Sequence, residues 1–398
     1  MKCVGIVSEY NPFHNGHLHQ IAGIRKEFGE DTAVVAVMSG NFTQRGEAAL
    51  FDKVHRAQCA VCAGVNLVLE LPFPYCASSA EYFCTAGVGI LDALGVVDTL
   101  SFGSESGDLS LLSLAAERLS SEEFKKKRAA LVEAHPNLGH AAITERAFCE
   151  LWGKELSFSP NNILALEYIM ALGRLGSSMS IHTIPRLGDY HGEMLHEGIA
   201  SASAIRKAIT DGSFDISDAL PHQTKEIMDA LSAQGYLGAN LERLYPAIAA
   251  KFLLNAVDPS TIQDGADGLY TRLQRMAMQA STLESLIEQT ETKKYTRARI
   301  RRVILHTLFG VTSSDLRVAP LYTQLLAADG IGLDILKRIK KQTAFPILTK
   351  PSDAARLPEN ARAQKALSDL ADRFYCLATP TARAPREALT YTPYIHGK

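Results

Sequence analysis

Short hydrophobic runs in the first half of the chain alternate with amphipathic stretches. Runs rich in β-branched residues predict buried strands, and apolar residues at helical spacing between them predict helices. We expect the strands at residues 2–7, 33–38, 67–71, 99–103 and 180–184. We expect the helices between them at residues 16–28, 52–63 and 80–94. Strands that alternate with helices are typical of a parallel sheet in a doubly wound α/β domain.

The pattern changes along the rest of the chain. Residues 108–175 are mostly helical, which predicts an insertion packed on the sheet. After about residue 213 no strand pattern is found, and amphipathic helical segments continue to about residue 377. The following stretch, 379–393, is rich in Pro, Thr and Ala and predicts a loop over the surface. We therefore expect a sheet domain over residues 1–212 and a mainly helical domain over residues 213–398.

Composition restricts the class of protein. The 398 residues are 46% hydrophobic and 21% charged, which is typical of globular proteins and excludes disordered and fibrous chains. No apolar run approaches the roughly 20 residues that span a bilayer, and the first apolar stretch is too short for a signal peptide. Seven cysteines at irregular spacing fit a reducing compartment. We expect a cytoplasmic protein without a membrane partner.

The formal net charge of −2 hides an uneven distribution. Residues 1–292 hold 22 Lys/Arg and 35 Asp/Glu, a net charge of −13, whereas residues 293–398 hold 19 and 8, a net charge of +11. A basic last quarter is expected where a protein meets a polyanion, although solvated helix faces explain charge clusters about as well. A second cluster lies at residues 337–341. The densest patch contains Lys293, Lys294, Arg297, Arg299, Arg301 and Arg302.

A histidine pair, His14 and His17, lies between the first predicted strand and the first predicted helix. In an open α/β sheet, ligands bind at this carboxyl end of the strands. Gly16 lets the backbone approach a ligand, and the helix start offers N–H groups and a positive dipole end to a phosphate. Both histidines can donate hydrogen bonds to an α-phosphate as charge develops there. This position makes a capped surface turn the less favoured interpretation.

A second polar element opens the helix after the last predicted strand. Ser201 or Ser203 is suited to cap this helix, and Arg206 lies where it can neutralise outer phosphates. By itself the segment is an ordinary helix N-terminus. Together with the histidine pair it predicts a nucleotide clamp, in which His14, His17, Ser203 and Arg206 are the catalytic residues.

The two motifs resemble those of the nucleotidylyltransferase superfamily, to which class I aminoacyl-tRNA synthetases are related. The stretches VGIVSEYNPFHNGHLHQ, AVMSGNFTQRGEAA, LVLELPFPY, FGSESGD, SPNNILALEYI and IASASAIRKAI resemble, in this order, the bacterial tRNA(Met) cytidine acetate ligase family. They cover about the first 210 residues, and KKYTRARIRRVILH extends the resemblance. The resemblance implies a Rossmann-like nucleotidyltransferase domain with a helical insertion, followed by a mainly α-helical domain.

The resemblance also implies an ATP site at the loop after the first strand, together with Gly103, Arg186 and one of Asn161 and Asn162. Gly103 ends a strand at a point where a side chain would block the nucleotide, and Arg186 can contact a phosphate. An asparagine can pair with a base edge, although a helix N-cap is as good a role for one of the two. Position 203 is Ser where the family usually has Thr, which keeps the hydroxyl. The loop residues assigned to ATP are Val7, Ser8, Glu9, Tyr10, Asn11, Pro12, Phe13, His14, Asn15, Gly16, His17, Leu18, His19 and Gln20.

The activity implied by the resemblance has two steps. Acetate is activated with ATP as acetyl-adenylate, and the acetyl group is transferred to N4 of the wobble cytidine of elongator tRNA(Met). Mg²⁺ would be carried by the ATP phosphates, and residues 293–302 would hold the tRNA backbone. Two alternatives stay open. One is a small-molecule adenylyltransferase of cofactor biosynthesis, which would not need the basic last quarter, and the other is a nucleotide-dependent RNA-binding module without chemistry.

Other polar candidates have weaker support. Cys59 and Cys62 have the spacing of zinc ligands, but their helical apolar surroundings favour core packing. Glu105 is equally consistent with a surface turn and with a contact to a metal-bound phosphate. Asp52, Lys53 and Arg56 fall on one helical face, for which a solvated ion-paired face is favoured over a role in lining the site. His191 and His196 are assigned to a structural loop.

Overall fold

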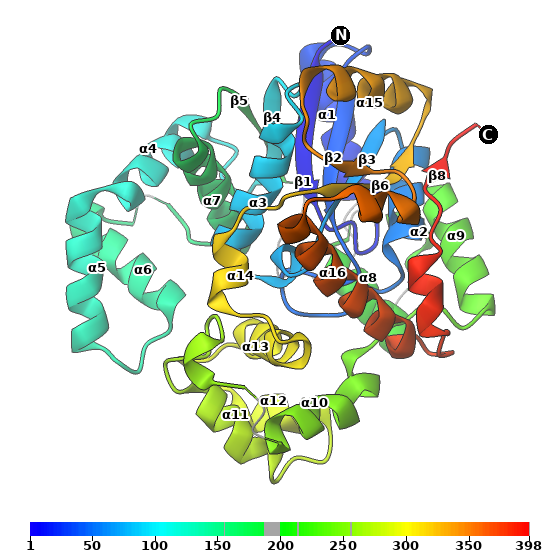
Figure 1. The fold of residues 1–398 in the computed structure, drawn as a ribbon. Coiled ribbons are helices and arrows are strands. Elements are labelled where there is room, and N and C mark those ends of the chain that lie inside the picture. Colours follow the sequence, from blue (N-terminus) through cyan, green and yellow to red (C-terminus); the bar gives the residue numbers. More distant parts are fainter. Residues whose placement is uncertain (155, 187–199, 213–214, 255–256, 398) are drawn as a thin grey trace.

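A mixed sheet lies at the centre of the structure (Figure 1). The computed structural model describes residues 1–154, 156–186, 200–212, 215–254 and 257–397. Among them the sheet order is β5-β4-β1-β2-β3-β6-β7, and β8 pairs with β6. The strands are β1 (Cys3–Ser8), β2 (Ala33–Ser39), β3 (Leu67–Leu71), β4 (Thr99–Ser104), β5 (Ser180–Pro185), β6 (Thr323–Ala328), β7 (Ile347–Leu348) and β8 (Tyr394–Ile395).

The first five strands run parallel, and each predicted strand is confirmed to within one residue at either end. β2 and β4 lie on either side of β1, with β3 and β5 outside them. The chain therefore leaves β1 in one direction and later returns to its other side. Such a reversal of strand order opens a crevice at the carboxyl ends of β1 and β4, where open α/β sheets bind their ligands.

The prediction that strands are absent after about residue 213 is wrong. β6 pairs antiparallel with β3, and β7 and β8 run parallel to β6. All residues of β6, with the sequence TQLLAA, are buried. A short strand buried on both faces has no polar alternation to separate it from a helix segment. The last quarter of the chain thus adds strands to the central sheet besides its helices.

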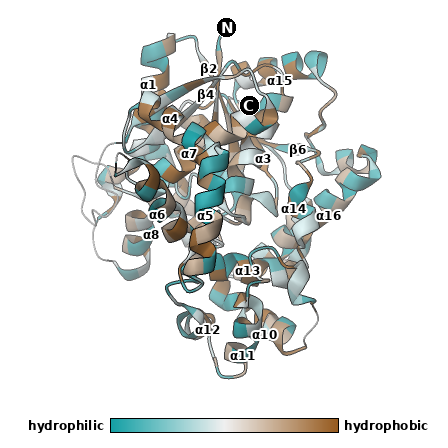
Figure 2. Cartoon of the chain, turned by 90° about the vertical axis from the view of Figure 1, so that its left-hand side faces the viewer, coloured by the Kyte–Doolittle hydropathy of each residue, from teal (hydrophilic) through white to brown (hydrophobic). Residues whose placement is uncertain are grey.

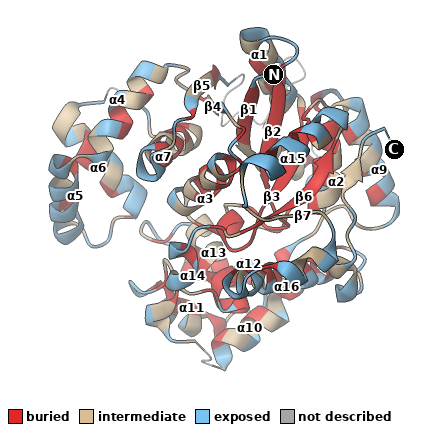
Figure 3. Ribbon diagram, turned by 45° about the horizontal axis from the view of Figure 1, so that its top comes forward, coloured by how far each residue is buried: buried red, intermediate tan, exposed pale blue. Residues whose placement is uncertain are grey.

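Helices cover both faces of the sheet, and its central strands β2, β3 and β6 are buried between them (Figure 3). Along β2, Val35 and Val37 point into one buried cluster, whereas Val34, Ala36 and Met38 point into the other. This explains the continuous hydrophobic run in the sequence. The first cluster is covered by α3 (Ala80–Ala93), α15 (Gly330–Gln342) and α16 (Glu359–Ala378), and the second by α1 (Asn15–Phe28), α2 (Lys53–Cys62), α8 (Ala202–Asp211) and α9 (His222–Ala233).

Two further groups of helices extend from the sheet (Figure 1). The predicted insertion between β4 and β5 is confirmed, and its last helix packs on α3. Hydrophobic and hydrophilic residues alternate along most helices, as amphipathic packing requires (Figure 2). None of the described helices is long and apolar enough to cross a bilayer. The two groups are α4 (Leu109–Ser120), α5 (Glu122–Ala134), α6 (His140–Trp152) and α7 (Pro160–Leu175), and then α10 (Tyr245–Leu253), α11 (Leu269–Ala277), α12 (Leu283–Thr290), α13 (Arg297–Phe309) and α14 (Ser313–Arg317).

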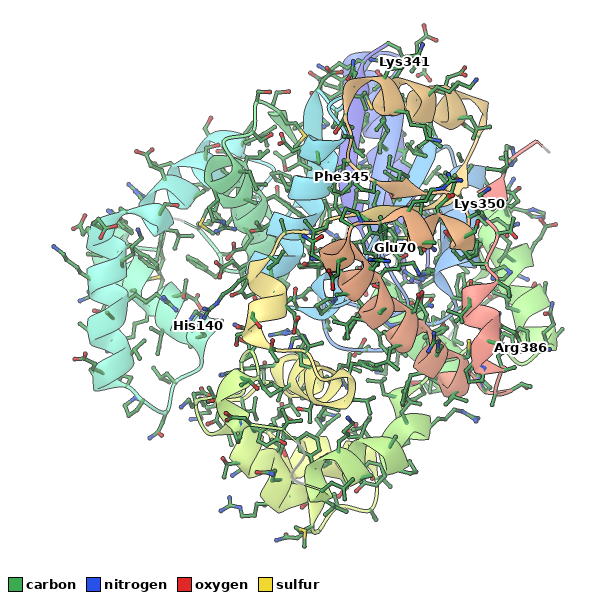
Figure 4. The ribbon with its side chains drawn as sticks, viewed as in Figure 1. Glu70, His140, Lys341, Phe345, Lys350 and Arg386 are labelled. Atoms are coloured by element: carbon green, nitrogen blue, oxygen red, sulfur yellow. The ribbon has the colours of Figure 1, made fainter. Side chains whose placement is uncertain are left out.

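A buried ion cluster joins α16 to the sheet. Nζ of Lys53 lies 2.6 Å from Oε1 of Glu70 on β3 and 2.6 Å from Oδ2 of Asp372 on α16. All three residues are buried, and Glu70 is labelled in Figure 4. Asp52 caps α2, and the buried guanidinium of Arg56 donates to carbonyl oxygens at the ends of β1 and β2. The interpretation of Lys53 and Arg56 as part of a solvated ion-paired face is therefore wrong, because both residues are buried. Asp52 pairs with His55 of the same helix and with Arg383.

Candidate active site

The loop after β1 ends in a helix cap made by the two histidines. His14 is the N-cap residue of α1, and its Nδ1 accepts a hydrogen bond from the backbone N–H of Gly16 at 3.1 Å. In return, Nδ1 of His17 accepts from the backbone N–H of His14 at 3.2 Å. A ring nitrogen that accepts carries no proton, so each neutral ring holds its proton on Nε2. The cap therefore leaves two Nε2–H groups as donors.

Both imidazoles are neutral at physiological pH. Desolvation, together with the positive charges of Arg186 and Arg206, lowers the pKa of His14 to about 3. Desolvation, together with His14 and Arg186, lowers the pKa of His17 well below its usual value. The two ring centroids lie 3.9 Å apart, so charging both rings would also cost repulsion. The pair thus supplies two uncharged donors at a place of positive potential, which suits a phosphate.

Aromatic side chains hold this pair in place. The ring centroids of Tyr10 and Phe13 lie 4.9 Å and 5.3 Å from that of His17, and both residues are buried. Tyr10 has φ = +45°, a left-handed conformation that costs a non-glycine residue on the order of 1–3 kcal/mol. Burial of the two aromatic rings offsets such a cost. The turn is therefore held by its packing and not by the backbone preference of its residues.

Arg186 approaches the histidines from the side of β4 and β5. Its Nη1 donates to Oδ1 of Asn161, near the start of α7, at 3.1 Å. Its stem crosses Gly103, where a Cβ atom would lie 3.1 Å from Cγ of the arginine, so glycine lets this side chain lie over the end of β4. Asn162 is buried, and its side chain bonds backbone groups of the loops before α4 and α7. Of the two asparagines, Asn161 is the one beside the arginine.

α8 brings Arg206 to the opposite side of the same loop. Oγ of Ser201 caps α8 by accepting from the N–H of Ala204, which leaves Ser203 exposed with its Oγ 3.3 Å from Nη2 of Arg206. Nη1 of Arg206 donates to the carbonyl oxygen of Asn11 at 2.8 Å. The start of α1, two arginines and two neutral donors therefore converge at the carboxyl end of β1. This arrangement is suited to the phosphates of a nucleotide.

Comparison with known sequences agrees with this geometry. The sequence model of the HIGH nucleotidyl transferase family matches residues 1–388. A tRNA(Met) cytidine acetate ligase of Acetivibrio thermocellus is 37% identical over 372 residues, which cover 89% of either chain. That of Caldanaerobacter subterraneus subsp. tengcongensis is 38% identical, over 91% of this chain and 92% of its own. The chain belongs to the tRNA(Met) cytidine acetate ligase family.

Solved structures show that this member of the cytidine acetate ligase family is similar to known proteins over its whole fold. Thermotoga maritima TmcAL in its apo form matches with a TM-score of 0.91, and the same protein bound with alpha-thio ATP matches with 0.89. Both are 30% identical, and 99% of each chain is covered. The resemblance inferred from motif order is therefore confirmed, and it includes the strands after residue 213.

Several loop residues that the cytidine acetate ligase resemblance assigns to ATP also support the fold. Oδ1 of Asn11 accepts from a backbone N–H of the loop before α2 at 2.7 Å, and Nδ2 of Asn15 donates to a backbone carbonyl after α8 at 2.8 Å. Nε2 of Gln20 lies 3.4 Å from a carbonyl oxygen of β4. Leu18 and His19 are exposed on α1. Their contacts with ATP stay predictions.

The loop after β2 lies at the site, although the sequence motifs assign no role to its residues. Glu47 lies 3.5 Å from Nη2 of Arg206 and 2.6 Å from Nη1 of Arg301 on α13. The backbone N–H of Gln44 donates to Oε1 of Glu9 at 2.6 Å, and desolvation raises the pKa of that carboxyl. β1 and β2 are parallel neighbours, so the loops after them share one edge of the sheet. The position of this loop directly after the second parallel strand is the sequence feature that could have placed Glu47 and Gln44 at the site.

The arginines of residues 293–302 are all ion-paired within the protein, and their side chains are only 11–32% exposed. They are therefore not a solvated helix face. Lys293 is exposed. Contact of this segment with tRNA stays a prediction. The pairs are Lys294 with Asp267, Arg297 with Glu284 and Glu291, Arg299 with Asp267, Arg301 with Glu47 and Arg302 with Asp264.

The remaining sequence candidates have varied outcomes. Cys59 is buried, which confirms core packing, and Cys62 lies beside the C-terminal segment. Oε1 of Glu105 accepts from the backbone at the N-terminus of α7. Among the described residues, no three His, Cys, Asp or Glu gather as metal ligands. His191 and His196 lie outside the described residues.

Proposed function

We propose that this protein is an ATP-dependent acetate ligase that acetylates N4 of the wobble cytidine in elongator tRNA(Met) through acetyl-adenylate. The observation that carries the proposal is the pair of neutral Nε2–H donors on His14 and His17, flanked by Arg186 and Arg206. Relatives named tRNA(Met) cytidine acetate ligase support it, because they match 89% and 91% of the chain. We accordingly propose a cytoplasmic location, where both ATP and tRNA are available.

In the first step, a carboxylate oxygen of acetate attacks the α-phosphorus of ATP, and pyrophosphate leaves with the electrons of the broken P–O bond. Negative charge grows on the α-phosphate oxygens and on the leaving group. His14 and His17 donate to the α-phosphate, whereas Ser203 and Arg206 bind the leaving pyrophosphate. The protein positions reactants and stabilises charge, and it need not provide a nucleophile.

If Mg²⁺ were bound with the phosphates of ATP, it would supply Lewis-acid stabilisation of the leaving pyrophosphate. Protein carboxylates commonly contact such a substrate-bound ion through one or two oxygens. Oε2 of Glu105 is buried without a hydrogen-bond partner, and Oε1 of the same group bonds Asn161, the partner of Arg186. Glu105 therefore fits a contact to phosphate-bound Mg²⁺ better than a surface turn.

In the second step, the N4 amine of cytidine attacks the acetyl carbon, AMP leaves with the electrons of the anhydride bond, and the amine releases a proton. The anhydride is already reactive, so the protein has mainly to position the amine. An anticodon base must leave its stack to reach the crevice. Arg301 contacts Glu47 at the edge of the clamp, so we place the path of the tRNA backbone along residues 293–302.

Exchange of labelled pyrophosphate into ATP tests the first step without RNA. The wild type should exchange only with acetate, and His17→Ala should slow exchange about 10²–10³-fold with little change in the KM for ATP. His222→Ala, whose side chain is 79% exposed on α9, is the matched control and should exchange normally. No exchange, with or without tRNA, would overturn the proposal.

Mass analysis of tRNA nucleosides tests the second step. N4-acetylcytidine should form in elongator tRNA(Met) when ATP, acetate and the protein are present together. Exchange without acetylation of any tRNA would favour a small-molecule adenylyltransferase instead.

A further inference from the structure

A cleft lined by unpaired cations lies between α15 and the chain that follows it. Its volume is about 380 Å³, and its lining includes Lys340 on α15, Lys350 after β7 and Arg356 at the end of the helical turn Pro351–Arg356. All three residues are exposed. None of them has an ion-pair partner among the residues that the structure describes. The cleft therefore presents three positive charges against the single carboxylate of Asp353, which interacts with Lys350.

Neighbouring residues extend this positive surface. Residues 330–357 carry six cations and two carboxylates. Arg338 and Lys341 are exposed and likewise lack ion pairs within the described part of the chain, whereas Lys337 pairs with Asp334 at 2.8 Å. Asp353 also lines the cleft, but its Oδ2 accepts three hydrogen bonds from residues 349 and 350. The local carboxylates therefore leave most of the positive charge unopposed.

This surface differs in one respect from residues 293–302, the other basic cluster. Each arginine there is held by a carboxylate of the protein, so a phosphate must displace an ion pair to bind. In the cleft, a phosphate displaces only counterions, and their release favours binding. Lys340 and Arg356 each lie in the last turn of a helical segment, where a cation is favourable, but Lys350 precedes the second segment and has no such role. The cleft is thus the better phosphate site.

We infer that this cleft binds the sugar–phosphate backbone of an RNA, away from the base that reacts. The identity of that RNA as the tRNA substrate rests on the proposed function. In Figure 1 α15 lies above the sheet and α13 lies below it, and the labelled Lys341, Phe345 and Lys350 lie in the upper half of the molecule (Figure 4). β7 is four strands from β1, which is about 19 Å across the sheet at about 4.8 Å per strand.

One RNA can bridge that span. The phosphates of a nucleic-acid strand follow one another every few ångströms, so about 19 Å spans several nucleotides of its backbone. A tRNA with its anticodon base in the crevice at β1 therefore has backbone within reach of the cleft. Lysine and arginine contacts to phosphate position an RNA without reading its sequence, so the cleft contributes affinity and orientation and not the choice of tRNA.

The variant Lys340→Ala/Lys350→Ala/Arg356→Ala tests this inference. Dissociation constants for elongator tRNA(Met) and for an unrelated tRNA are measured across a salt series. Loss of three phosphate contacts should flatten the slope of log K against log salt by about 2–3 units, equally for both tRNAs. Acetate-dependent pyrophosphate exchange and the KM for ATP should stay unchanged, because the cleft lies apart from the histidine pair.

A matched control removes the same charge elsewhere. Lys125→Ala/Lys126→Ala/Lys127→Ala on α5 takes away three lysines, two of which already pair with Glu122 and Glu150, and should leave the slope unchanged. An unchanged slope in the cleft variant, or an equal change in the control, would overturn the inference. A raised KM for ATP with normal tRNA binding would make the cleft a nucleotide site and also overturn it. Absence of exchange in the wild type would refute the proposed ligase activity, whereas a flattened slope would still support the RNA contact.

Discussion

Replacing His14 by Asn separates two roles that the structure assigns to one side chain. Nδ1 of His14 caps α1 by accepting from the N–H of Gly16, while its Nε2–H is a donor at the proposed phosphate site. Asparagine is among the best N-cap residues, because its Oδ1 accepts the same kind of hydrogen bond. Its side chain is shorter than an imidazole and does not place a donor where Nε2 lies. His14→Asn therefore keeps the cap and loses the donor, whereas His14→Ala loses both.

The two variants should differ in stability and agree in rate. Loss of an N-cap hydrogen bond costs about 0.5–2 kcal/mol in free energy of unfolding, so His14→Ala should be less stable than His14→Asn by about 1 kcal/mol. Loss of a donor that acts only on the transition state costs about 10²–10³ in rate. Both variants should therefore slow adenylation to a similar extent, with a KM for ATP that changes much less than kcat.

Denaturant unfolding measures the stability of each variant, and acetate-dependent pyrophosphate exchange measures kcat and the KM for ATP. Near-normal exchange by a stable His14→Asn protein would mean that the Nε2–H donor is dispensable. A raised KM with an unchanged kcat in either variant would make His14 a residue of ground-state binding alone. Either result would refute the assignment of this histidine to the transition state.

Four further predictions concern buried or paired charges. Lys53→Met leaves Glu70 and Asp372 buried without their cation, so the free energy of unfolding should fall by about 3–5 kcal/mol; an unchanged denaturant midpoint would contradict this. Glu47→Gln removes a carboxylate that lies 3.5 Å from Arg206 and competes with phosphate for it. A partly exposed ion pair is worth up to about 1 kcal/mol, so the KM for ATP should fall about two- to fivefold. A higher KM would instead give Glu47 a positioning role. Because the pKa values of both clamp histidines are lowered, kcat/KM for ATP should show no loss of activity titrating near pH 6.5. Unfolded histidines bind protons near pH 6.5, so the pair's contribution to stability is complete above that pH and is lost as the pH falls below it, for His14 toward its pKa of about 3. Unfolding at pH 5 and pH 7 measures this loss.

The sequence by itself determined the parallel half of the sheet and the place of the site. Strands β1 to β3 are mostly apolar runs, whereas β4 and β5 mix apolar and polar residues. Clear helical patterns separate all five, so period and length identify them without tertiary information. The histidine pair follows the first strand, and the carboxyl end of that strand is where such folds bind ligands. Ser201 and Arg206 open α8 as their residue types indicate.

Only the tertiary structure decided which polar residues face the site and which hold the fold. Asn161 and Asn162 are adjacent and chemically identical, and only packing directs one to Arg186 and buries the other. The sequence pattern predicts a solvated Lys53, whereas in the fold Asp372 on α16, 319 residues away, contacts it. The strand β6 carries no periodic signal because both its faces are buried.

The same reason applies to the charges of the last quarter. Composition shows that residues 293–302 and 337–341 are both basic, but it does not show which carboxylates reach them. The arginines of the first cluster are paired by residues of other elements, whereas Lys340 and Lys341 of the second have no such partner among the described residues. The energy of a charge depends on neighbours brought together by long-range folding, and a linear pattern of residue types does not contain those distances.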